Sequence, residues 1–197
     1  STQNIEAQVL LKVDMGRIAI TDGMSEKAVS ILLKAGHSVH QEHYSEDQIL
    51  RGALLDYDAV VIRSATKLLK KEIEASSSVN GGIGFIGRAG VGVDNIDIDT
   101  ATNHGIYVCN TPTASTRSVV ELTMGHLIAS SRHIPSADKS LKKGLWEKKK
   151  FRGTELGGKN LGLIGFGRIA RGVANIAIAF GMEVHIFDPF ISETPEG

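Results

Sequence analysis

Residues 160–189 constrain the fold of this chain more than any other segment. A short apolar run at 161–164 leads into the stretch GFGRIA at 165–170, which has the GxGxxA spacing of a dinucleotide-binding turn. A helical pattern follows, and a second apolar run at 183–187 ends at Asp188. A strand, a glycine turn, a helix, a strand and an acid in this order predict a βαβ unit that holds a dinucleotide.

The small residues of the turn have separate physical roles. Gly165 allows the chain to turn tightly from strand to helix, Gly167 lets the backbone approach a pyrophosphate, and Ala170 keeps the helix close to the sheet. The N–H groups and the positive dipole end at the helix start attract phosphate. The predicted cofactor contacts in the turn are Gly165, Phe166, Gly167, Arg168 and Ile169.

The acid at the end of the second strand selects the cofactor. The carboxylate of Asp188 can accept hydrogen bonds from the adenosine ribose 2′-hydroxyl, and its charge repels a 2′-phosphate, so we expect NAD rather than NADP. Gly181 is expected to end the helix between the strands. Its predicted apolar face consists of Ile169, Val173, Ile176, Ala177 and Phe180.

Composition excludes several classes of partner. The 197 residues are 42% hydrophobic and carry 22 basic and 22 acidic side chains, so the net charge of zero gives no electrostatic case for nucleic acid or an anionic membrane. No apolar run approaches the roughly 18 residues of a spanning helix, and no secretory signal is visible. The single cysteine, Cys109, is interpreted as a buried small hydrophobe and suits a reducing compartment. We therefore expect a cytoplasmic protein with no nucleic-acid or membrane partner.

Strands alternate with helices before this segment. Strands are expected at 17–21, 38–44, 57–63, 85–88 and 106–110. Helices are expected after an N-cap at Ser25 up to Gly36, and at 46–55, 67–75 and 97–104, with a loop at 76–84. This alternation predicts an α/β chain with two doubly wound parallel-sheet (Rossmann-like) domains, the second incomplete. The predicted divisions are an extension at 1–16, a first domain at 17–108 and a nucleotide domain at 109–197.

The connection between the two domains is helical in pattern. Ser118 and Glu121 have the spacing of a capping box and are expected to open an apolar helix that runs to about residue 131. Pro135 then breaks the helix, and a second helical piece follows at 136–144. Six basic residues around Trp146 at 142–152 are interpreted as a solvated turn.

Two arginines in the first domain are candidates for anion binding. Arg63 lies at the carboxyl end of a predicted strand, where it could bind a phosphate or carboxylate in bidentate fashion; the alternative is an ion pair with a nearby acid. Arg88 precedes Ala89-Gly90-Val91-Gly92, whose N–H groups could form an anion-binding nest; the alternative is a simple turn.

Several stretches together resemble one family. VVIRSATK at 60–67, GRAGVGVDNIDIDTAT at 87–102, VCNTP at 108–112, WEKKKFRGTELGGK at 146–159 and LGLIGFGRIA at 161–170 occur in this order. They are similar to the D-isomer-specific 2-hydroxyacid dehydrogenases over about residues 17–190. The resemblance implies that the first domain is a lid and substrate domain, to which the chain returns after the nucleotide domain.

The resemblance also implies a reaction and its residues. It is strongest to the branch that oxidises 3-phospho-D-glycerate with NAD to 3-phosphohydroxypyruvate, the first step of phosphorylated serine synthesis. The family's catalytic arginine, glutamate and histidine are expected beyond Gly197, so we predict no catalytic residue in this chain. No pair of its seven histidines has the context of zinc ligands, so we predict no metal site either. Val91 stands where close relatives often carry threonine, and it is expected to approach the cofactor as well. The implied substrate contacts are Arg63, Ser64, Arg88, Gly90, Val91 and Gly92.

The resemblance further implies self-association as a homodimer or homotetramer through the helix from Ser118 and the segment around Trp146, with intramolecular core packing as the alternative. Two other functions stay open. One is a different 2-hydroxyacid dehydrogenase, such as a glyoxylate or hydroxypyruvate reductase. The other is a non-catalytic NAD-binding regulator of the corepressor type.

Overall fold

The computed structural model describes residues 16–78 and 81–191. The chain divides after Thr113 into two compact units, each with its own strands, helices and hydrophobic cluster. The sequence prediction placed residue 109 in the second domain, but Cys109 pairs with Gly87 in the sheet of the first unit. The sheet of the first unit therefore extends past the predicted division at 108.

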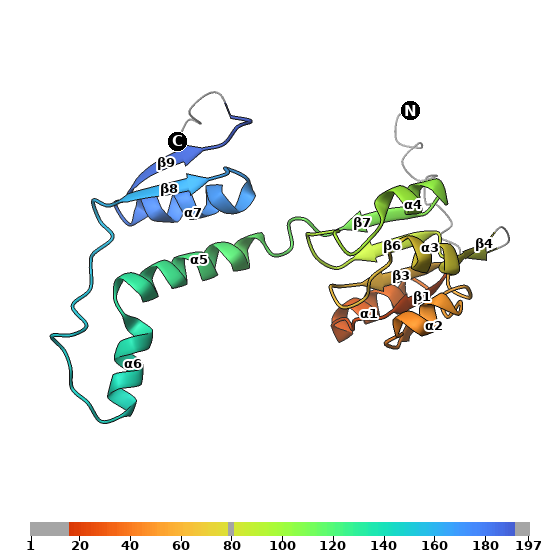
Figure 1. Cartoon of the computed structure of the whole chain (residues 1–197), viewed down its shortest axis with the longest axis horizontal. Helices are drawn as coiled ribbons and strands as arrows, with labels where there is room; N and C mark the ends of the chain where they lie inside the picture. The colour runs from red at the N-terminus through yellow and green to blue at the C-terminus, as the bar shows by residue number, and fades with distance from the viewer. Residues whose placement is uncertain (1–15, 79–80, 192–197) are drawn as a thin grey trace, which may run out of the picture. The chain divides into compact units, whose positions relative to one another are not determined.

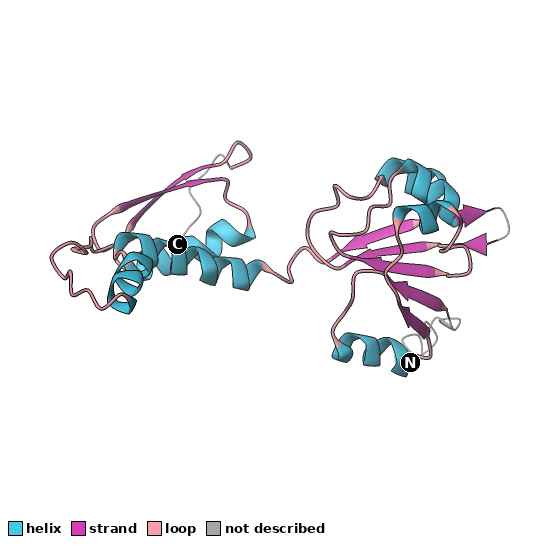
Figure 2. Cartoon of the chain, turned by 60° about the horizontal axis from the view of Figure 1, so that its bottom comes forward, coloured by secondary structure: helices cyan, strands magenta, loops and turns pink. Residues whose placement is uncertain are grey.

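The first unit is a parallel sheet with helices on both faces (Figures 1 and 2). Its strands are β1 (Arg17–Ile20), β2 (Ser38–Gln41), β3 (Ala59–Ile62), β6 (Phe85–Arg88) and β7 (Tyr107–Asn110). Its helices are α1 (Glu26–Lys34), α2 (Glu46–Leu50), α3 (Lys70–Ser76) and α4 (Ile98–Asn103). Figure 2 shows α1 on one face of the sheet and the other three helices on the opposite face.

The strand order of this sheet is β2-β1-β3-β6-β7. The chain first moves outward from β1 to β2 and then returns past β1 to β3, so β1 and β3 flank the point where the direction of winding reverses. In doubly wound sheets this switch point is where ligands bind, outside the carboxyl ends of the strands. The predicted doubly wound fold is confirmed, and it marks the ends of β1 and β3 as the place to look for a site.

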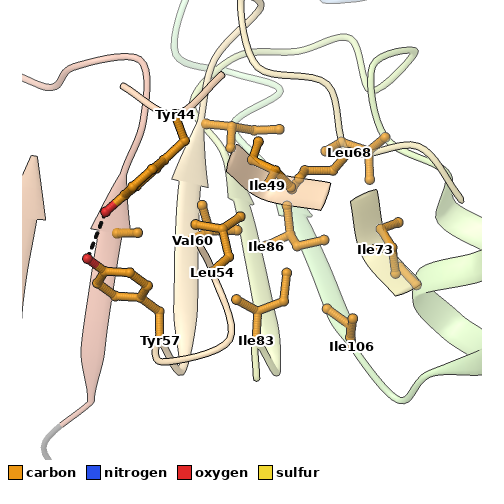
Figure 3. Close-up of a cluster of buried hydrophobic side chains, with 14 residues drawn as sticks. Tyr44, Ile49, Leu54, Tyr57, Val60, Leu68, Ile73, Ile83, Ile86 and Ile106 are labelled. Atoms are coloured by element: carbon orange, nitrogen blue, oxygen red, sulfur yellow. Dashed lines mark hydrogen bonds between the residues drawn. The ribbon is translucent and has the colours of Figure 1, made fainter. Parts of the chain in front are cut away.

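The core of the first unit lies between the sheet and helices α2, α3 and α4 (Figure 3). Side chains alternate across a strand, so Val60 and Ile62 of β3 point into this core while Val61 points to the opposite face. The hydroxyl oxygens of Tyr44 and Tyr57 are hydrogen-bonded at 2.8 Å at the margin of the cluster. On the opposite face α1 buries none of its residues completely. The sheet is therefore packed closely on one face only.

Cys109 lies on the less covered face. It is exposed, as is Tyr107, which is 76% accessible and shares its side of β7. The prediction of a buried cysteine is wrong, because β7 is an edge strand and the core lies on the face of Val108.

Helix starts were predicted with mixed success. The hydroxyl of Ser25 caps α1 by accepting the N–H of Ala28 at 3.3 Å, as expected. The predicted capping box at Ser118 is wrong, because the helix α5 (Thr116–Ser131) begins earlier and the carboxylate of Glu121 binds Arg117 at 2.9 Å. A capping box is formed instead at the start of α2.

Several loops also differ from the predictions. The segment predicted as a loop at 76–84 contains a short antiparallel pair, β4 (Ser77–Ser78) and β5 (Gly81–Gly82). Helix α2 ends at Leu50 rather than at 55, and the chain then turns through Gly52 at a positive φ of 88°. The long predicted strand at 38–44 ends at Gln41.

The second unit contains a βαβ unit and two preceding helices, α5 and α6 (Ile134–Lys142). Strands β8 (Asn160–Ile164) and β9 (Glu183–Phe187) are parallel, and helix α7 (Arg168–Ala179) connects them. These are the predicted elements at the predicted positions.

Helices α5 and α7 pack closely. A Cβ on Gly172 would lie 2.7 Å from Cγ2 of Val120, so the glycine allows the contact. Val120, Met124 and Val173 form the buried cluster around it. The predicted apolar face of α7 is only partly buried, since Val173 and Ala177 are enclosed but Ile169 and Phe180 are 39% and 46% accessible. Two described strands are too few to cover the whole face.

Candidate functional site

The predicted cofactor residues of the second unit come together at the carboxyl ends of β8 and β9 (Figure 1). Gly165 has a positive φ of 84° and donates its N–H to the carbonyl of Phe187 at 2.7 Å, which ties the turn to the end of β9. Apart from the chain neighbours of each glycine, no atom of the described residues lies within 4 Å of the Cβ positions of Gly165 and Gly167. The backbone of the turn is therefore open to a close approach, as a pyrophosphate site requires.

Asp188 lies directly against this turn. One carboxylate oxygen accepts the N–H of Phe166 at 2.7 Å, and the other accepts the N–H of Phe190 at 2.9 Å. These backbone hydrogen bonds from Phe190 and Phe166, with a smaller contribution from the charge of Arg171, hold the pKa of Asp188 below its usual range. The carboxylate is charged at neutral pH, and each oxygen retains a lone pair for a ribose hydroxyl.

The other predicted residues of the turn differ in accessibility. Arg168 and Ile169 are exposed at the start of α7, where the helix dipole is positive. The side chain of Phe166 is buried, with the guanidinium of Arg171 4.5 Å from its ring centroid. Sequence reasoning missed Arg171, although its helical position one turn after Gly167 places it next to the turn.

In the first unit, Arg63 and Ser64 are exposed directly after β3, at the switch point of the sheet. Asp22, which directly follows the neighbouring β1 and Thr21, accepts the N–H of Arg63 at 2.7 Å. The alternative of an ion pair finds no support, because among the described residues the Arg63 side chain forms no salt bridge and Asp22 binds only its backbone. The guanidinium is thus available to a ligand.

The predicted anion loop follows β6, the strand next to β3. Two of its N–H groups are used internally, since Ala89 donates to the carbonyl of Ile62 at 2.9 Å and Gly90 to that of Arg88 at 2.8 Å. No hydrogen bond within the described part of the chain uses the N–H groups of Val91 and Gly92. The loop can therefore offer two of the predicted amides to an anion.

Arg88 folds back over its own loop. A Cβ on Gly90 would collide with the Arg88 guanidinium, so only glycine allows this conformation. One guanidinium nitrogen lies 3.4 Å from the carbonyl of Ala89, and the buried Nε has no hydrogen-bond partner among the described residues. The side chain has donor capacity that its own chain leaves unused.

Two residues that sequence reasoning missed hold the loop from β7. The amide of Asn110 donates to the carbonyl of Val91 at 2.7 Å, and the N–H of Thr111 donates to that of Gly90 at 2.9 Å. Asn110 ends β7 and Thr111 follows it, and this place at the carboxyl end of a strand was the signal that could have identified them, because Arg63 was found by that rule. Val91 itself is 43% accessible.

The predicted substrate residues are gathered at one edge of one sheet. Ile62 pairs with Arg88, so Arg63 and the loop from Arg88 start from neighbouring strand ends. The predicted cofactor residues between 165 and 188 are gathered in the second unit. Val91, which was also predicted to contact the cofactor, belongs to the first unit. Within the described residues, no group of three or more His, Cys, Asp or Glu side chains is arranged as metal ligands, and no helix is long and apolar enough to cross a membrane.

The chain as a whole matches a known family. The family model for the D-isomer specific 2-hydroxyacid dehydrogenase catalytic domain matches residues 18–194. The chain belongs to this family of oxidoreductases.

Individual relatives are similar over most of the chain. The D-3-phosphoglycerate dehydrogenase of Methanocaldococcus jannaschii is 45% identical over 177 residues, which are 90% of this chain and 33% of the relative. The hydroxypyruvate reductase of Thermotoga maritima is 45% identical over 179 residues, 90% of this chain and 57% of the relative. The chain thus spans between a third and somewhat over half of these proteins.

Solved structures agree with the fold. The 3-phosphoglycerate dehydrogenase of Entamoeba histolytica, solved with its cofactor NAD+ bound, superposes with a TM-score of 0.69 at 32% identity, covering 91% of this chain and 56% of that one. The TT0316 protein of Thermus thermophilus superposes with a TM-score of 0.77 at 28% identity, covering 88% of this chain and 57% of that one.

Proposed function

We propose that the protein containing this chain oxidises 3-phospho-D-glycerate with NAD to 3-phosphohydroxypyruvate, the first step of phosphorylated serine synthesis. The observation that carries the proposal is the pairing of Ile62 with Arg88 in the sheet. Because of this pairing, Arg63 and the loop that begins at Arg88 lie at the ends of neighbouring strands. A substrate with both a phosphate and a carboxylate needs two such anion-binding groups. Relatives named D-3-phosphoglycerate dehydrogenase at 45% and 41% identity support the choice.

In this proposal the chain binds and orients both reactants. Arg63 and Ser64 bind one anionic group of the substrate, and the amides of Val91 and Gly92 bind the other, with Arg88 beside them. Gly165, Gly167, Arg168 and Ile169 hold the pyrophosphate, and Asp188 holds the ribose. Bound NAD supplies the acceptor for the hydride that leaves C2 of the substrate. Hydride transfer also requires an acid/base group, which this proposal assigns to none of the described residues.

The cofactor part is tested on the 197-residue chain by calorimetric titration with NAD and with NADP. We expect NAD to bind at micromolar to millimolar concentration and NADP to bind more weakly, because the charged Asp188 repels a 2′-phosphate. Equal binding of the two dinucleotides would contradict the assignment of Asp188.

The substrate part is tested on the full-length protein by comparing kcat/KM for 3-phosphoglycerate, glyoxylate and hydroxypyruvate. We expect the phosphorylated substrate to be preferred, and Arg63→Ala to weaken its use about tenfold or more while affecting glyoxylate less. The relative from Thermotoga maritima favours hydroxypyruvate reduction as the second candidate. A preference for hydroxypyruvate would establish that candidate.

One alternative function and one prediction from the sequence stay open. A full-length protein that binds NAD but turns over none of these substrates would favour a corepressor-like regulator. The cytoplasmic location stays a prediction.

Self-association is proposed through the apolar side chains of α6 and the segment after it. Ile134, Leu141, Leu145 and Trp146 are 51%, 58%, 50% and 81% accessible, and they line a depression of about 580 Å³. Apolar exposure of this extent in one place is typical of an interface. Light scattering should show a dimer or tetramer of the full-length protein, and Trp146→Ala should shift it toward monomer, whereas Lys149→Ala in the same segment should not.

A further inference from the structure

The loop that follows β3 has its backbone held at both ends by side chains from elsewhere in the fold. The first and last residues of this loop, Arg63 and Thr66, each have one N–H and one carbonyl. Asp22 accepts both N–H groups, and Asn95 donates to both carbonyls. All four backbone groups are therefore fixed by two residues that are far away in the sequence.

Asp22 reaches the loop from the end of β1. Its Oδ2 lies 2.7 Å from the N–H nitrogen of Arg63 and 3.0 Å from that of Thr66. Its Oδ1 accepts the hydroxyl of Thr66 at 2.6 Å, and the hydroxyl of Thr21 lies 3.4 Å away. We call Asp22 and Asn95 together the clamp of this loop. Hydrogen bonds to a charged acceptor are stronger than those between neutral groups, so the carboxylate of Asp22 forms the stronger bonds of the clamp.

Asn95 reaches the same loop from the segment after β6. Its Nδ2 donates to the carbonyl of Arg63 at 2.8 Å and to that of Thr66 at 2.7 Å. The side chain is nearly enclosed, with 7% of the residue accessible. The backbone supports the same connection, because the N–H of Leu68 donates to the carbonyl of Asn95 at 2.9 Å.

The clamp leaves a specific set of groups for a ligand. Ser64 and Ala65 are exposed between the two clamped residues, and no hydrogen bond in the described part of the chain uses their N–H groups. With the backbone of Arg63 fixed, the base of its side chain is fixed as well. A rigid base reduces the conformational entropy that the guanidinium loses when it binds an anion.

We infer that Asp22 and Asn95 are positioning residues, which hold loop 63–66 so that Arg63 and Ser64 can bind the substrate anion. This inference rests on the function proposed above. Asp22 is negatively charged and lies at the switch point, but its oxygens accept hydrogen bonds from the loop itself, so in this inference it holds the loop and leaves substrate contact to Arg63 and Ser64. Its oxygens are occupied by N–H and O–H donors, and it forms no salt bridge with the Arg63 guanidinium among the described residues, so the guanidinium stays available to the anion.

The test uses matched variants of the full-length protein. Asp22→Asn keeps the size of the side chain but replaces one acceptor oxygen by a donor. Asp58→Asn is the control. The carboxylate of Asp58 also accepts a backbone N–H from a neighbouring strand, that of Arg17 at 2.6 Å, but Asp58 lies directly before β3, away from the loop that follows the strand. Asn95→Asp sets a carboxylate against two carbonyls, and Asn103→Asp at the exposed end of α4 is its control.

Two quantities are measured for each variant. The dissociation constants of 3-phosphoglycerate and of NAD are obtained by calorimetry, and deuterium uptake is followed in the peptide that covers 63–66. We expect Asp22→Asn and Asn95→Asp to weaken 3-phosphoglycerate binding about tenfold and to speed exchange of the loop, with NAD binding unchanged. The two controls should change the 3-phosphoglycerate constant by less than about twofold.

The possible results separate this inference from the proposed function. If Arg63→Ala abolishes binding but Asp22→Asn behaves like Asp58→Asn, the positioning role is wrong and the anion site stands. If the unaltered full-length protein does not bind 3-phosphoglycerate, both are overturned. If Asp22→Asn weakens NAD binding to the same extent, the effect is general unfolding and the inference fails.

Discussion

The carboxylate of Asp188 illustrates how much of this site depends on single residues. It was selected from the sequence as the acceptor for a ribose hydroxyl, but it also binds the N–H groups of Phe166 and Phe190. One of these belongs to the glycine turn itself. The acid thus has a second role, holding the turn in place, which a motif defined by spacing does not reveal.

The two roles of Asp188 are separable by substitution. Asp188→Asn retains one carbonyl oxygen that can hold the N–H of Phe166, whereas Asp188→Ala holds neither N–H. We expect both variants to lose discrimination against NADP, because the negative charge is gone, but only Asp188→Ala to lose most of its NAD affinity. Calorimetry with both dinucleotides decides this. Equal NAD affinities of the two variants would show that the hydrogen bond to the turn is unimportant.

The pH dependence of stability follows from Asp22. Burial pushes the pKa of Asp22 up, but the hydrogen bonds from Thr66, Arg63 and Thr21 outweigh it and lower the pKa below its ordinary value of 3.8. A carboxyl whose folded pKa is lowered stabilises the fold above its unfolded pKa, and this stabilisation is lost as the pH falls through the folded pKa.

We therefore expect the free energy of unfolding of the unaltered chain to exceed that of Asp22→Asn by a constant amount between pH 5 and 8. The difference should shrink below about pH 4. Urea titrations across this range measure it. A difference that stays the same down to pH 3 would mean that the charge of Asp22 contributes nothing.

The contact between helices α5 and α7 depends on a glycine that the fingerprint does not include. The Cβ of an alanine at Gly172 would lie 2.7 Å from Cγ2 of Val120. Gly125, inside α5, has no atom within 4 Å of its Cβ position. The two glycines interrupt helices in the same way, but only one of them is required by packing.

Substitution by alanine should therefore have opposite effects at the two positions. We expect Gly125→Ala to stabilise the chain by about 1 kcal/mol, because alanine is the better helix former. Gly172→Ala should destabilise it by about 1 kcal/mol, since overpacking outweighs the same gain. Adding Val120→Ala removes the clash, so Gly172→Ala should no longer destabilise that variant. Denaturant unfolding of the four proteins tests the pattern, and additive effects of Val120 and Gly172 would contradict it.

The sequence predicted the elements well where local signals decide them. Helix α7 has the predicted position because its helical apolar run ends at Gly181, and β9 has the predicted position because its apolar run begins after Gly181 and ends at Asp188. The signals failed where a distant partner decides the outcome. Glu121 pairs with Arg117 rather than capping a helix, and Cys109 is exposed because the core lies on the other face of its strand.

The candidate sites divide in the same way. Arg63 and the glycine turn were found because strand ends and glycine spacing are visible in one dimension. Asp22 and Asn95 were not found, because their role exists only once loop 63–66 lies between them. Asp22 directly follows the strand predicted at 17–21, but this position does not reveal that its carboxylate binds the backbone of another loop.

The two compact units differ in how completely they bury their apolar side chains. The first has a core of fourteen buried side chains, including Leu54, Ile62 and Ile86, which have no measurable exposure. The second has a smaller cluster, and Ile164 and Phe187 at its two strand ends are 93% and 68% accessible. A pair of strands with one closely packed helix is marginal by itself. The first unit should therefore be the more stable of the two.

This difference predicts two steps in the denaturant unfolding of the 197-residue chain. Residues 114–191 should unfold first, and NAD should raise the stability of that step alone, by about 2.7 kcal/mol at a concentration one hundred times its dissociation constant. Hydrogen exchange resolves the steps, because peptides of β8, α7 and β9 report the second unit and those of β3 and β6 the first. Protection by NAD should appear in the former peptides and disappear in Asp188→Ala. A single transition, or equal protection of both units, would mean that the units unfold as one cooperative structure.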